Sequence, residues 1–111
     1  MRRKPGDILP LEADILQLAQ ERDGQHEPWF HGWTIGRQLE DATGRVTPFG
    51  TLYRTLDRLE ELGCLVSEWV EPAKNGTPRR RQYRITPEGS RALATAPRTP
   101  VRARLTPRLA N

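Results

Sequence analysis

Apolar side chains recur every three or four residues in three segments of the first half of the chain. This spacing predicts amphipathic helices over residues 10–22, 34–42 and 48–62. The positions that define the three apolar stripes are Leu11, Ile15, Leu18 and Ala19, then Ile35, Leu39 and Ala42, and finally Leu52, Leu56, Leu59 and Leu62. Each helix therefore offers one side to a core and leaves the other for solvent or a partner.

Residues with capping and turn preferences mark where these helices end. The Asp-Gly pair at 23–24 ends the first predicted helix, and Gly44 ends the second. Thr47 is the predicted N-cap of the third helix and Pro48 its first residue, where a missing N–H leaves no hydrogen bond unmade. Gly63 is expected to close the third helix in a left-handed conformation.

The pattern changes to a two-residue alternation after the third helix. Residues 65–71 and 82–86 are predicted strands, and an Asn-Gly pair at 75–76 favours a hairpin turn within the basic loop between them. Thr86 is predicted to cap a fourth helix over residues 87–95. The order helix, helix, helix, hairpin, helix predicts a mainly α fold with a small β-hairpin, the winged helix-turn-helix.

The composition is that of one small domain, with 35% hydrophobic and 29% charged residues among 111. Residues 10–96 are expected to form it, with a flexible basic N-terminus over 1–9 and a disordered Pro- and Arg-rich tail over 97–111. No apolar run approaches the ~20 residues of a membrane span, and no apolar stretch follows the basic N-terminus as in a signal peptide. Together with a single cysteine, Cys64, these features indicate a cytoplasmic protein.

Positive charge is concentrated in three segments. Residues 2–4, 74–84 and 98–108 hold twelve of the eighteen Lys and Arg residues and none of the fourteen Asp and Glu residues. The rest of the chain is therefore net negative, although the whole has a formal net charge of +4. An acidic body with purely basic patches is typical of a polyanion-binding protein. The alternative is that the basic residues serve solubility only.

The polar side of the third predicted helix is a candidate DNA-contacting surface. At about 100° of rotation per residue, its members Thr47, Thr51, Arg54 and Arg58 lie roughly opposite the leucines. In a helix-turn-helix this side enters the major groove, and the first helical turn offers backbone N–H groups and a positive dipole end to a phosphate. Gly50 would let a DNA backbone approach closely.

Two carboxylates offer a competing interpretation of the same helix. Asp57 and Glu61 each follow an arginine by three residues, a spacing at which ion pairs within the helix would occupy Arg54 and Arg58. Both carboxylates also repel phosphate. Contact with DNA is therefore expected to be confined to the first two turns.

Four cations without an acidic neighbour occupy the predicted hairpin loop: Lys74, Arg79, Arg80 and Arg81. A phosphate backbone would relieve their mutual repulsion, and arginine can bind phosphate through two N–H groups or enter a minor groove. The competing interpretation is a loop that is merely solvated.

Four aromatic residues, Trp33, Tyr53, Trp69 and Tyr83, could act as stacking platforms for single-stranded bases. The chain has few other large apolar side chains, however. This scarcity favours a core position for Trp33, Tyr53 and Trp69.

Trp29 and Phe30 fall in a predicted loop with His26 and His31, and the pattern gives these four residues no role. The two histidines and Cys64 lack the paired spacing of metal ligands, so no metal site is expected. Cys64 is predicted to be a small buried apolar residue. No nucleophile–base pair, phosphate-binding glycine loop or carboxylate pair indicates catalysis, so neither an enzyme nor a cofactor is expected.

Three segments together resemble the winged-helix domain of the PadR-like transcriptional regulators. They are HGWTIGRQLE, TPFGTLYRTLDRLEELGCL and PRRRQYRITPEGSRAL, and the resemblance extends from about residue 11 to residue 93. It implies a DNA-binding repressor of a nearby promoter, with the third helix as the recognition helix and the hairpin as the wing. The residues that match DNA-contacting positions of the family are Thr47, Pro48, Gly50, Thr51, Tyr53, Arg54, Arg79, Arg80 and Arg81. The residue-level reasoning adds Arg58 and Lys74 to this candidate DNA-binding set.

One departure from the family concerns the C-terminal part. Family members commonly continue into helices that form a dimer and often an effector pocket, whereas this chain becomes Pro- and Arg-rich soon after Leu93. The expected partner is double-stranded DNA, and a small-molecule effector is not expected. The oligomeric state stays open between a homodimer, a monomer and an assembly that depends on another protein. The alternative functions are a protein-binding adaptor built on a winged helix, and binding of RNA or DNA through the basic patches without sequence preference.

Overall fold

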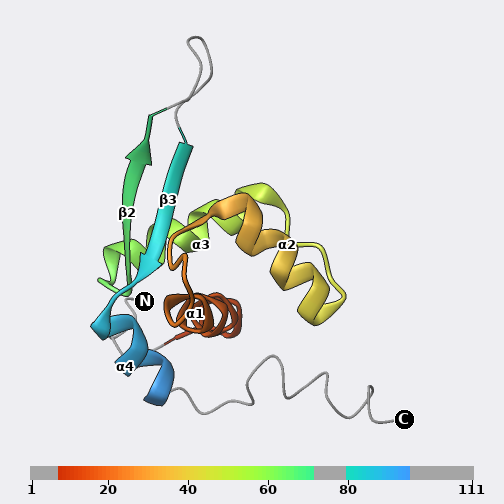
Figure 1. The fold of residues 1–111 in the computed structure, drawn as a ribbon. Helices are drawn as coiled ribbons and strands as arrows, with labels where there is room; N and C mark the ends of the chain where they lie inside the picture. Colours follow the sequence, from red (N-terminus) through yellow and green to blue (C-terminus); the bar gives the residue numbers. More distant parts are fainter. Residues whose placement is uncertain (1–7, 72–79, 96–111) are drawn as a thin grey trace.

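A computed structural model describes residues 8–71 and 80–95 of the chain. Its elements, in order, are α1 (Pro10–Asp23), β1 (Phe30–His31), α2 (Gly32–Thr43), α3 (Phe49–Glu61), β2 (Leu65–Val70), β3 (Arg80–Ile85) and α4 (Pro87–Thr95) (Figure 1). The predicted flexible ends and the predicted Asn-Gly turn at 75–76 lie largely or wholly outside the described residues. Within them, the three helices, the hairpin and the last helix follow in the predicted order.

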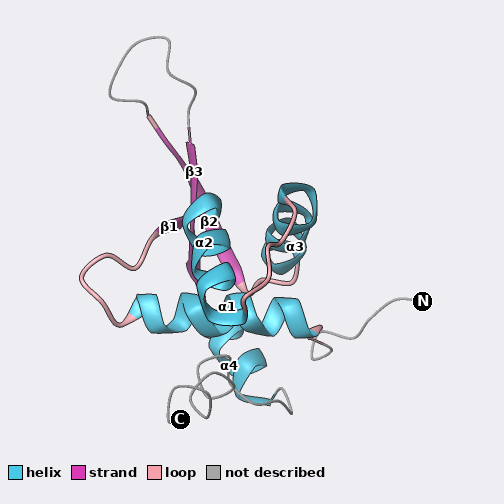
Figure 2. Ribbon diagram, turned by 90° about the vertical axis from the view of Figure 1, so that its right-hand side faces the viewer, coloured by secondary structure: helices cyan, strands magenta, loops and turns pink. Residues whose placement is uncertain are grey.

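Helix α1 lies at the centre of the fold. It contacts α2, α3, α4 and β3, and Figure 2 shows it running beneath α2 and α3 with α4 on its other side. This arrangement explains why α1 buries more than the one stripe that its spacing predicts. Ala13 and Leu16 are fully buried together with Ile15, Leu18 and Ala19. The paired strands β2 and β3 extend away from this helical body as a wing, so the fold is a winged helix-turn-helix (Figure 1).

Glycines end α2 and α3 as predicted. Gly44 and Gly63 have φ angles of 75° and 80°, in the left-handed region that side chains other than glycine rarely adopt. After α3, the Gly63 N–H donates to the Glu60 carbonyl at 3.0 Å, and the Cys64 N–H donates to the Leu59 carbonyl at 2.9 Å. This pair of bonds satisfies the last helical carbonyls and turns the chain sharply into β2.

The predicted cap of the last helix is also confirmed. The side-chain oxygen of Thr86 accepts a hydrogen bond from the Gly89 N–H at 3.0 Å. Gly89 is required here because a Cβ at this position would collide with the carbonyl oxygen of Cys64. Helix α4 therefore starts in close contact with the turn that ends α3.

The sheet contains a strand that the sequence pattern did not predict. Its order is β1-β3-β2, with all neighbours antiparallel, and Phe30 of β1 is paired with Tyr83 of β3. Phe30, predicted to lie in a loop, is buried, and its ring centroid lies 5.9 Å from that of Tyr83. A strand of two residues is too short to show alternation, so only the pairing with β3 reveals it.

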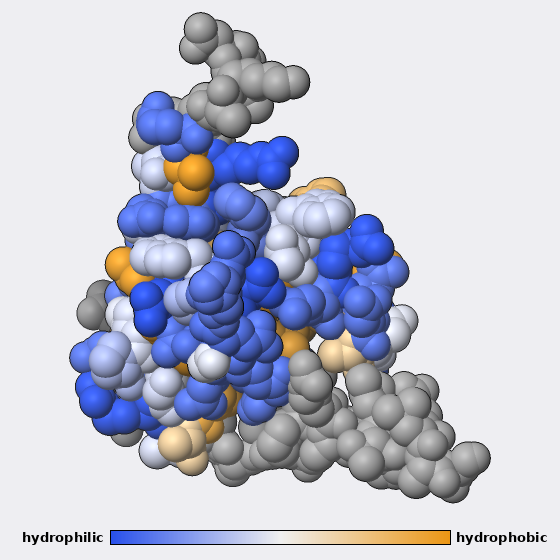
Figure 3. Space-filling model, in the orientation of Figure 1, coloured by the Kyte–Doolittle hydropathy of each residue, from blue (hydrophilic) through white to orange (hydrophobic). Residues whose placement is uncertain are grey.

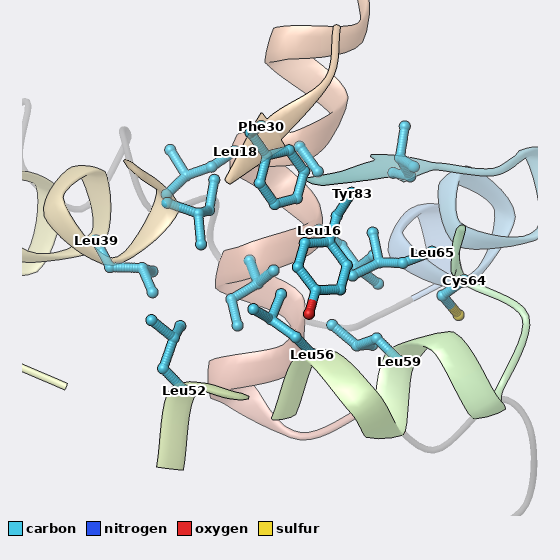
Figure 4. Packing of buried hydrophobic residues seen from close by; sticks show 14 residues of the cluster. Leu16, Leu18, Phe30, Leu39, Leu52, Leu56, Leu59, Cys64, Leu65 and Tyr83 are labelled. Atoms are coloured by element: carbon cyan, nitrogen blue, oxygen red, sulfur yellow. The ribbon is translucent and has the colours of Figure 1, made fainter. Parts of the chain in front are cut away.

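Leucines and two aromatic rings fill the core. Leu52, Leu56 and Leu59 of α3 are buried as predicted, and Figure 4 shows the Tyr83 ring directed into this leucine cluster. Cys64 is buried at its edge, which confirms the prediction of a small apolar role. Phe30 and Tyr83 thus take the space that the sequence interpretation gave to three other aromatic residues.

The prediction that Trp33, Tyr53 and Trp69 complete the core is wrong. Their exposed fractions are 56%, 38% and 54%. Trp69 lies on the same face of β2 as the buried Leu65. It is four residues farther along the strand, however, where the helical body no longer covers the sheet. Periodicity therefore identified the correct face of the strand but not where the core ends.

The outer surface around these elements is mostly polar. On the face shown in Figure 3, hydrophilic residues predominate and apolar positions form small, separate patches. No helix in the described ranges has both the length and the apolar character needed to cross a bilayer.

Candidate nucleic-acid interface

Helix α3 exposes a polar side opposite its buried leucines. Arg54, Asp57, Arg58 and Glu61 are all exposed, and Thr51 is half-buried. The side chains of Arg54 and Arg58 form no ion pair with any described residue, so the intrahelical pairs of the competing interpretation are not present there. Two arginines on this side thus remain available to an anionic partner.

The start of α3 differs from the prediction by one residue. The helix begins at Phe49, and Pro48 rather than Thr47 is its N-cap, with φ −56° and ψ 143°. The Pro48 carbonyl accepts the first helical hydrogen bond, from the Leu52 N–H at 2.9 Å. The Thr47 side chain makes no capping bond, because a residue that precedes proline is held in an extended conformation and stays outside the helix.

This start leaves backbone donors uncapped in the first turn of α3. No side chain accepts a hydrogen bond from the helix start, and Gly50 is exposed. A Cβ added at Gly50 would meet no atom within 4 Å, so packing within the protein does not require a glycine there. The uncovered backbone fits close approach by a partner, as the sequence predicts.

Tyr53 connects α3 to the beginning of α2. A Cβ added at Gly32 would lie 2.7 Å from Cε1 of the Tyr53 ring, so this ring fits directly against the backbone of Gly32. The Phe49 ring, whose centroid lies 6.3 Å away, flanks it on α3. The glycine of the His-Gly-Trp segment therefore has a packing role, which places Tyr53 at the surface between the two helices of the helix-turn-helix.

Of the four predicted wing cations, Arg80 and Arg81 belong to β3, whereas Lys74 and Arg79 lie outside the described residues. Because neighbouring strand residues point to opposite faces, Arg80 and Arg81 have different surroundings. Arg80 is exposed and forms no ion pair or side-chain hydrogen bond with a described residue. Arg81 faces α3 and is half-buried.

Glu60 holds Arg81 in place, a role that the sequence interpretation missed. Nη2 of Arg81 donates to Oε1 of Glu60 at 3.0 Å, while Nε donates to Oγ of Ser67 at 3.0 Å. The Ser67 hydroxyl in turn donates to Oε2 of Glu60 at 2.7 Å. The Arg81 guanidinium also lies 5.5 Å from the centroid of the Trp69 ring and 5.9 Å from that of Tyr83. This network fixes the base of the wing to the second half of α3.

A cleft of about 880 Å³ lies between α3, the start of α2 and the wing. Its walls carry the aromatic residues Trp33, Tyr53, Trp69 and Tyr83. Arg80, Arg81 and Asp57 are the charged residues that line it. The structure therefore brings Tyr53 of α3 together with both described wing arginines, and adds two tryptophans that were expected in the core.

Thr47 and Pro48 lie elsewhere on the surface. Both line a separate hollow of about 550 Å³ between the α2–α3 connection and the first turns of α1. Thr47 is half-buried and Pro48 exposed. The candidate DNA-binding residues thus follow α3 from its first turn to the cleft beside the wing, rather than forming one compact cluster.

Two buried groups resist ionisation, the Tyr83 hydroxyl in the wall of the cleft and the Cys64 thiol in the core. Burial raises the pKa of the Tyr83 hydroxyl, although the nearby Arg81 guanidinium acts in the opposite direction. Burial, with the carboxylates of Glu12 and Glu88, raises the pKa of the Cys64 thiol. A neutral, buried thiol is a poor nucleophile.

In the parts of the chain that the structure describes, no three His, Cys, Asp or Glu residues form a group that could hold a metal ion.

Comparison with known proteins agrees with this architecture. Residues 15–95 match the model of a family described as the transcriptional regulator PadR-like family. A transcriptional regulator of Mycobacterium tuberculosis, Rv3488, is 48% identical over 63 residues, which cover 57% of this chain and 55% of the relative. The match thus spans about half the length of that protein.

Solved structures show the same fold. A transcriptional regulator from Clostridium thermocellum has a TM-score of 0.62 and 31% identity, over 76% of this chain and 75% of its own. A PadR-like transcription factor from Bacteroides fragilis has the same TM-score and identity, over 76% of this chain and 73% of its own. Both structures support the winged-helix interpretation of the described elements.

Proposed function

The chain belongs to the PadR-like family of transcriptional regulators, and on that basis we propose that it binds double-stranded DNA with sequence preference and represses transcription in the cytoplasm. The exposed side of α3 enters a major groove, with Thr51 and Arg54 nearest the bases. The wing arginines contact the adjacent phosphates or minor groove. Lys74 and Arg79, which precede β3, extend this contact beyond the described residues.

The observation that carries the proposal is the position of unpaired cations on two neighbouring elements. Arg54 and Arg58 on α3 and Arg80 on β3 are exposed and have no acidic partner among the described residues. Arg80 also lines the cleft between the wing and α3, so exposed cations occur on the two elements that a winged helix presents to DNA. A duplex supplies the missing anions, and each contact releases counterions, which favours binding.

Sequence selection from a random duplex pool tests this function. We expect a short motif to be enriched, because the major-groove contacts of α3 are confined to its first two turns. The mass of the protein in solution, measured alongside, gives the stoichiometry. A two-fold symmetric motif bound by two chains would establish a homodimer, whereas an asymmetric motif bound by one chain would establish a monomer. Retention of the pool without enrichment would contradict sequence-specific binding and favour contact through the basic patches alone.

One feature favours a second function, a protein-binding adaptor. Asp57 and Glu61 are exposed on the same side of α3 as the arginines, and neither forms an ion pair with a described residue. Mixed charge suits a protein partner better than a polyanion. Association with a partner protein that survives nuclease treatment, from a chain that retains no duplex, would support the adaptor over the DNA-binding regulator.

A further inference from the structure

The cleft beside the wing lies where one strand of a bound duplex must pass. In B-DNA a single sugar–phosphate strand separates a major groove, about 12 Å wide, from the adjacent minor groove, about 6 Å wide. If α3 occupies the major groove and the wing reaches the adjacent minor groove, that strand crosses the space between α3 and β3. The cleft lined by Tyr53 of α3 and Arg81 of β3 is this space.

The walls of the cleft are aromatic rings with guanidinium groups set over them. Trp33 and Trp69 expose more than half of their surface. The Arg37 guanidinium lies 5.4 Å from the centroid of the Trp33 ring, and that of Arg81 lies 5.5 Å from the Trp69 ring. An apolar surface that is flanked by guanidinium N–H donors is complementary to a chain that alternates apolar sugars with anionic phosphates.

We propose that Trp33 and Trp69 grip the sugar–phosphate strand that separates the two contacted grooves, with Arg81 positioned by Glu60 to meet one of its phosphates. The inference rests on the proposed DNA-binding function and deepens it. The tryptophans pack on deoxyribose surfaces, so their contribution is mainly apolar. They strengthen binding to every sequence and carry little of the salt dependence that ionic contacts produce.

Asp57 determines which positions in the cleft a phosphate can occupy. Its carboxylate is exposed in the cleft wall and forms no ion pair with a described residue. A phosphate close to this carboxylate is repelled, whereas a phosphate near Arg81 is attracted. The two side chains therefore fix the register of the strand along the cleft, and Asp57 lowers affinity as it does so.

Binding titrations with a short labelled duplex test the grip. We expect Trp69→Ala to weaken binding about tenfold, because a half-exposed indole loses contact area worth about that factor, while the salt slope stays unchanged. The matched control is Val66→Ala, an exposed position on the opposite face of the same strand, which should change affinity by less than about twofold. Circular dichroism establishes that both variants remain folded.

A second set of measurements leaves the tryptophan side chains of the cleft in place. A variant with Trp29→Phe keeps both tryptophans of the cleft, Trp33 and Trp69, as the reporters, and duplex binding should change their fluorescence. Asp57→Asn should raise affinity about threefold at low salt, and Glu61→Gln, one turn farther along α3 and outside the cleft lining, should raise it less. In a series of duplexes, one phosphate at a time is replaced by an uncharged methylphosphonate. The gain in affinity from Asp57→Asn should disappear only when the replaced phosphate is one of the neighbouring phosphates of a single strand that face Asp57.

The outcomes separate this inference from the function on which it rests. If the wild-type chain binds duplex but Trp69→Ala binds it as tightly as Val66→Ala does, and the fluorescence of the cleft tryptophans does not respond, the proposed role of the tryptophans is wrong and the function stands. If the wild-type chain binds no duplex, the proposed function fails and the grip with it. If single-stranded oligothymidine displaces the labelled duplex as well as unlabelled duplex does, the proposed position of the sugar–phosphate strand is wrong, and the aromatic rings stack on bases instead. Binding of anilinonaphthalene sulfonate in the cleft, without loss of DNA affinity in Trp69→Ala, would assign the cleft to a small aromatic anion.

Discussion

The two ends of one sheet face have opposite surroundings. At one end of the β2–β3 ladder, Leu65 is paired with Ile85 and both side chains are buried. At the other end, Trp69 is paired with Arg81, and the indole is 54% exposed in the cleft beside α3. The alternation of side chains is unbroken between them. What changes is the cover, because the helical body buries the first end, whereas α3 meets the second end through the half-exposed pair of Glu60 and Arg81.

This difference separates stability from binding along a single strand pair. The buried end holds the wing to the body, and the exposed end presents a rigid surface to a partner. Because the strands of the wing extend beyond the helical body, their far end exposes apolar and cationic residues on the same face that is buried at the near end. The largest expected effects of mutation therefore fall at the buried end when unfolding is measured, and at the exposed end when DNA binding is measured.

The largest effect is expected from Leu65→Ala. Removing a fully buried leucine side chain leaves a cavity in the core, and we expect the free energy of unfolding to fall by about 2–4 kcal/mol. Trp69→Ala, on the same face, should lower it by less than about 1 kcal/mol, because the indole is half in solvent. Urea denaturation followed by circular dichroism measures both. Equal losses would mean that the exposed end of the wing also stabilises the fold.

Arg80→Ala is expected to give the next largest effect, on DNA binding alone. Loss of one phosphate contact should weaken binding to all duplexes about tenfold and lower the salt slope by about 1. The control is Arg91→Ala, which removes the same charge from α4, where Arg91 is paired with Glu88 at 3.1 Å. Fluorescence anisotropy over a range of salt concentrations measures both quantities. A salt slope that is unchanged in Arg80→Ala would remove the wing from the interface.

Much of this fold was predictable because its signals are local. The apolar stripe of α3, the left-handed Gly63 and the Thr86 cap depend on residues within one or two turns of each other, and the structure confirms them. The start of α3 was predicted to within one residue. The DNA-binding residues follow from the same pattern and from the family resemblance, and they await the binding measurements.

The features that the sequence did not reveal depend on contacts between distant segments. Strand β1 exists only through pairing of Phe30 with Tyr83, more than fifty positions away along the chain. The tether of Arg81 joins Glu60 of α3 to β3, and no spacing rule relates those two positions. The exposure of Trp33 and Trp69 depends on how far the helices cover the sheet, which periodicity does not encode.

Glu60→Gln tests whether the tether supports the exposed end of the wing. Glu60 and Arg81 are each about one-third exposed, so we expect the free energy of unfolding to fall by about 1 kcal/mol at most. Glu88→Gln, which breaks the more exposed pair with Arg91, should have a smaller effect. Duplex affinity is the second measurement. A Glu60→Gln variant with unchanged stability and unchanged affinity would show that Arg81 does not need its tether.

The smallest effect concerns Tyr83, which lies between the two ends, opposite Ser67. Burial raises the pKa of its hydroxyl above the usual value of 10.0, so the folded state favours the neutral phenol more strongly than the unfolded chain does. This contribution to stability is complete below the unfolded pKa and is lost as the pH rises through the folded pKa. Urea midpoints of the wild-type chain should therefore fall more steeply above about pH 10 than those of Tyr83→Phe, which has no group to ionise. Tyr53→Phe is the control for removal of a phenol at the surface. Parallel alkaline curves for the wild-type chain and Tyr83→Phe would show that solvent reaches the middle of the sheet face, and that the boundary between its two ends lies nearer to Leu65.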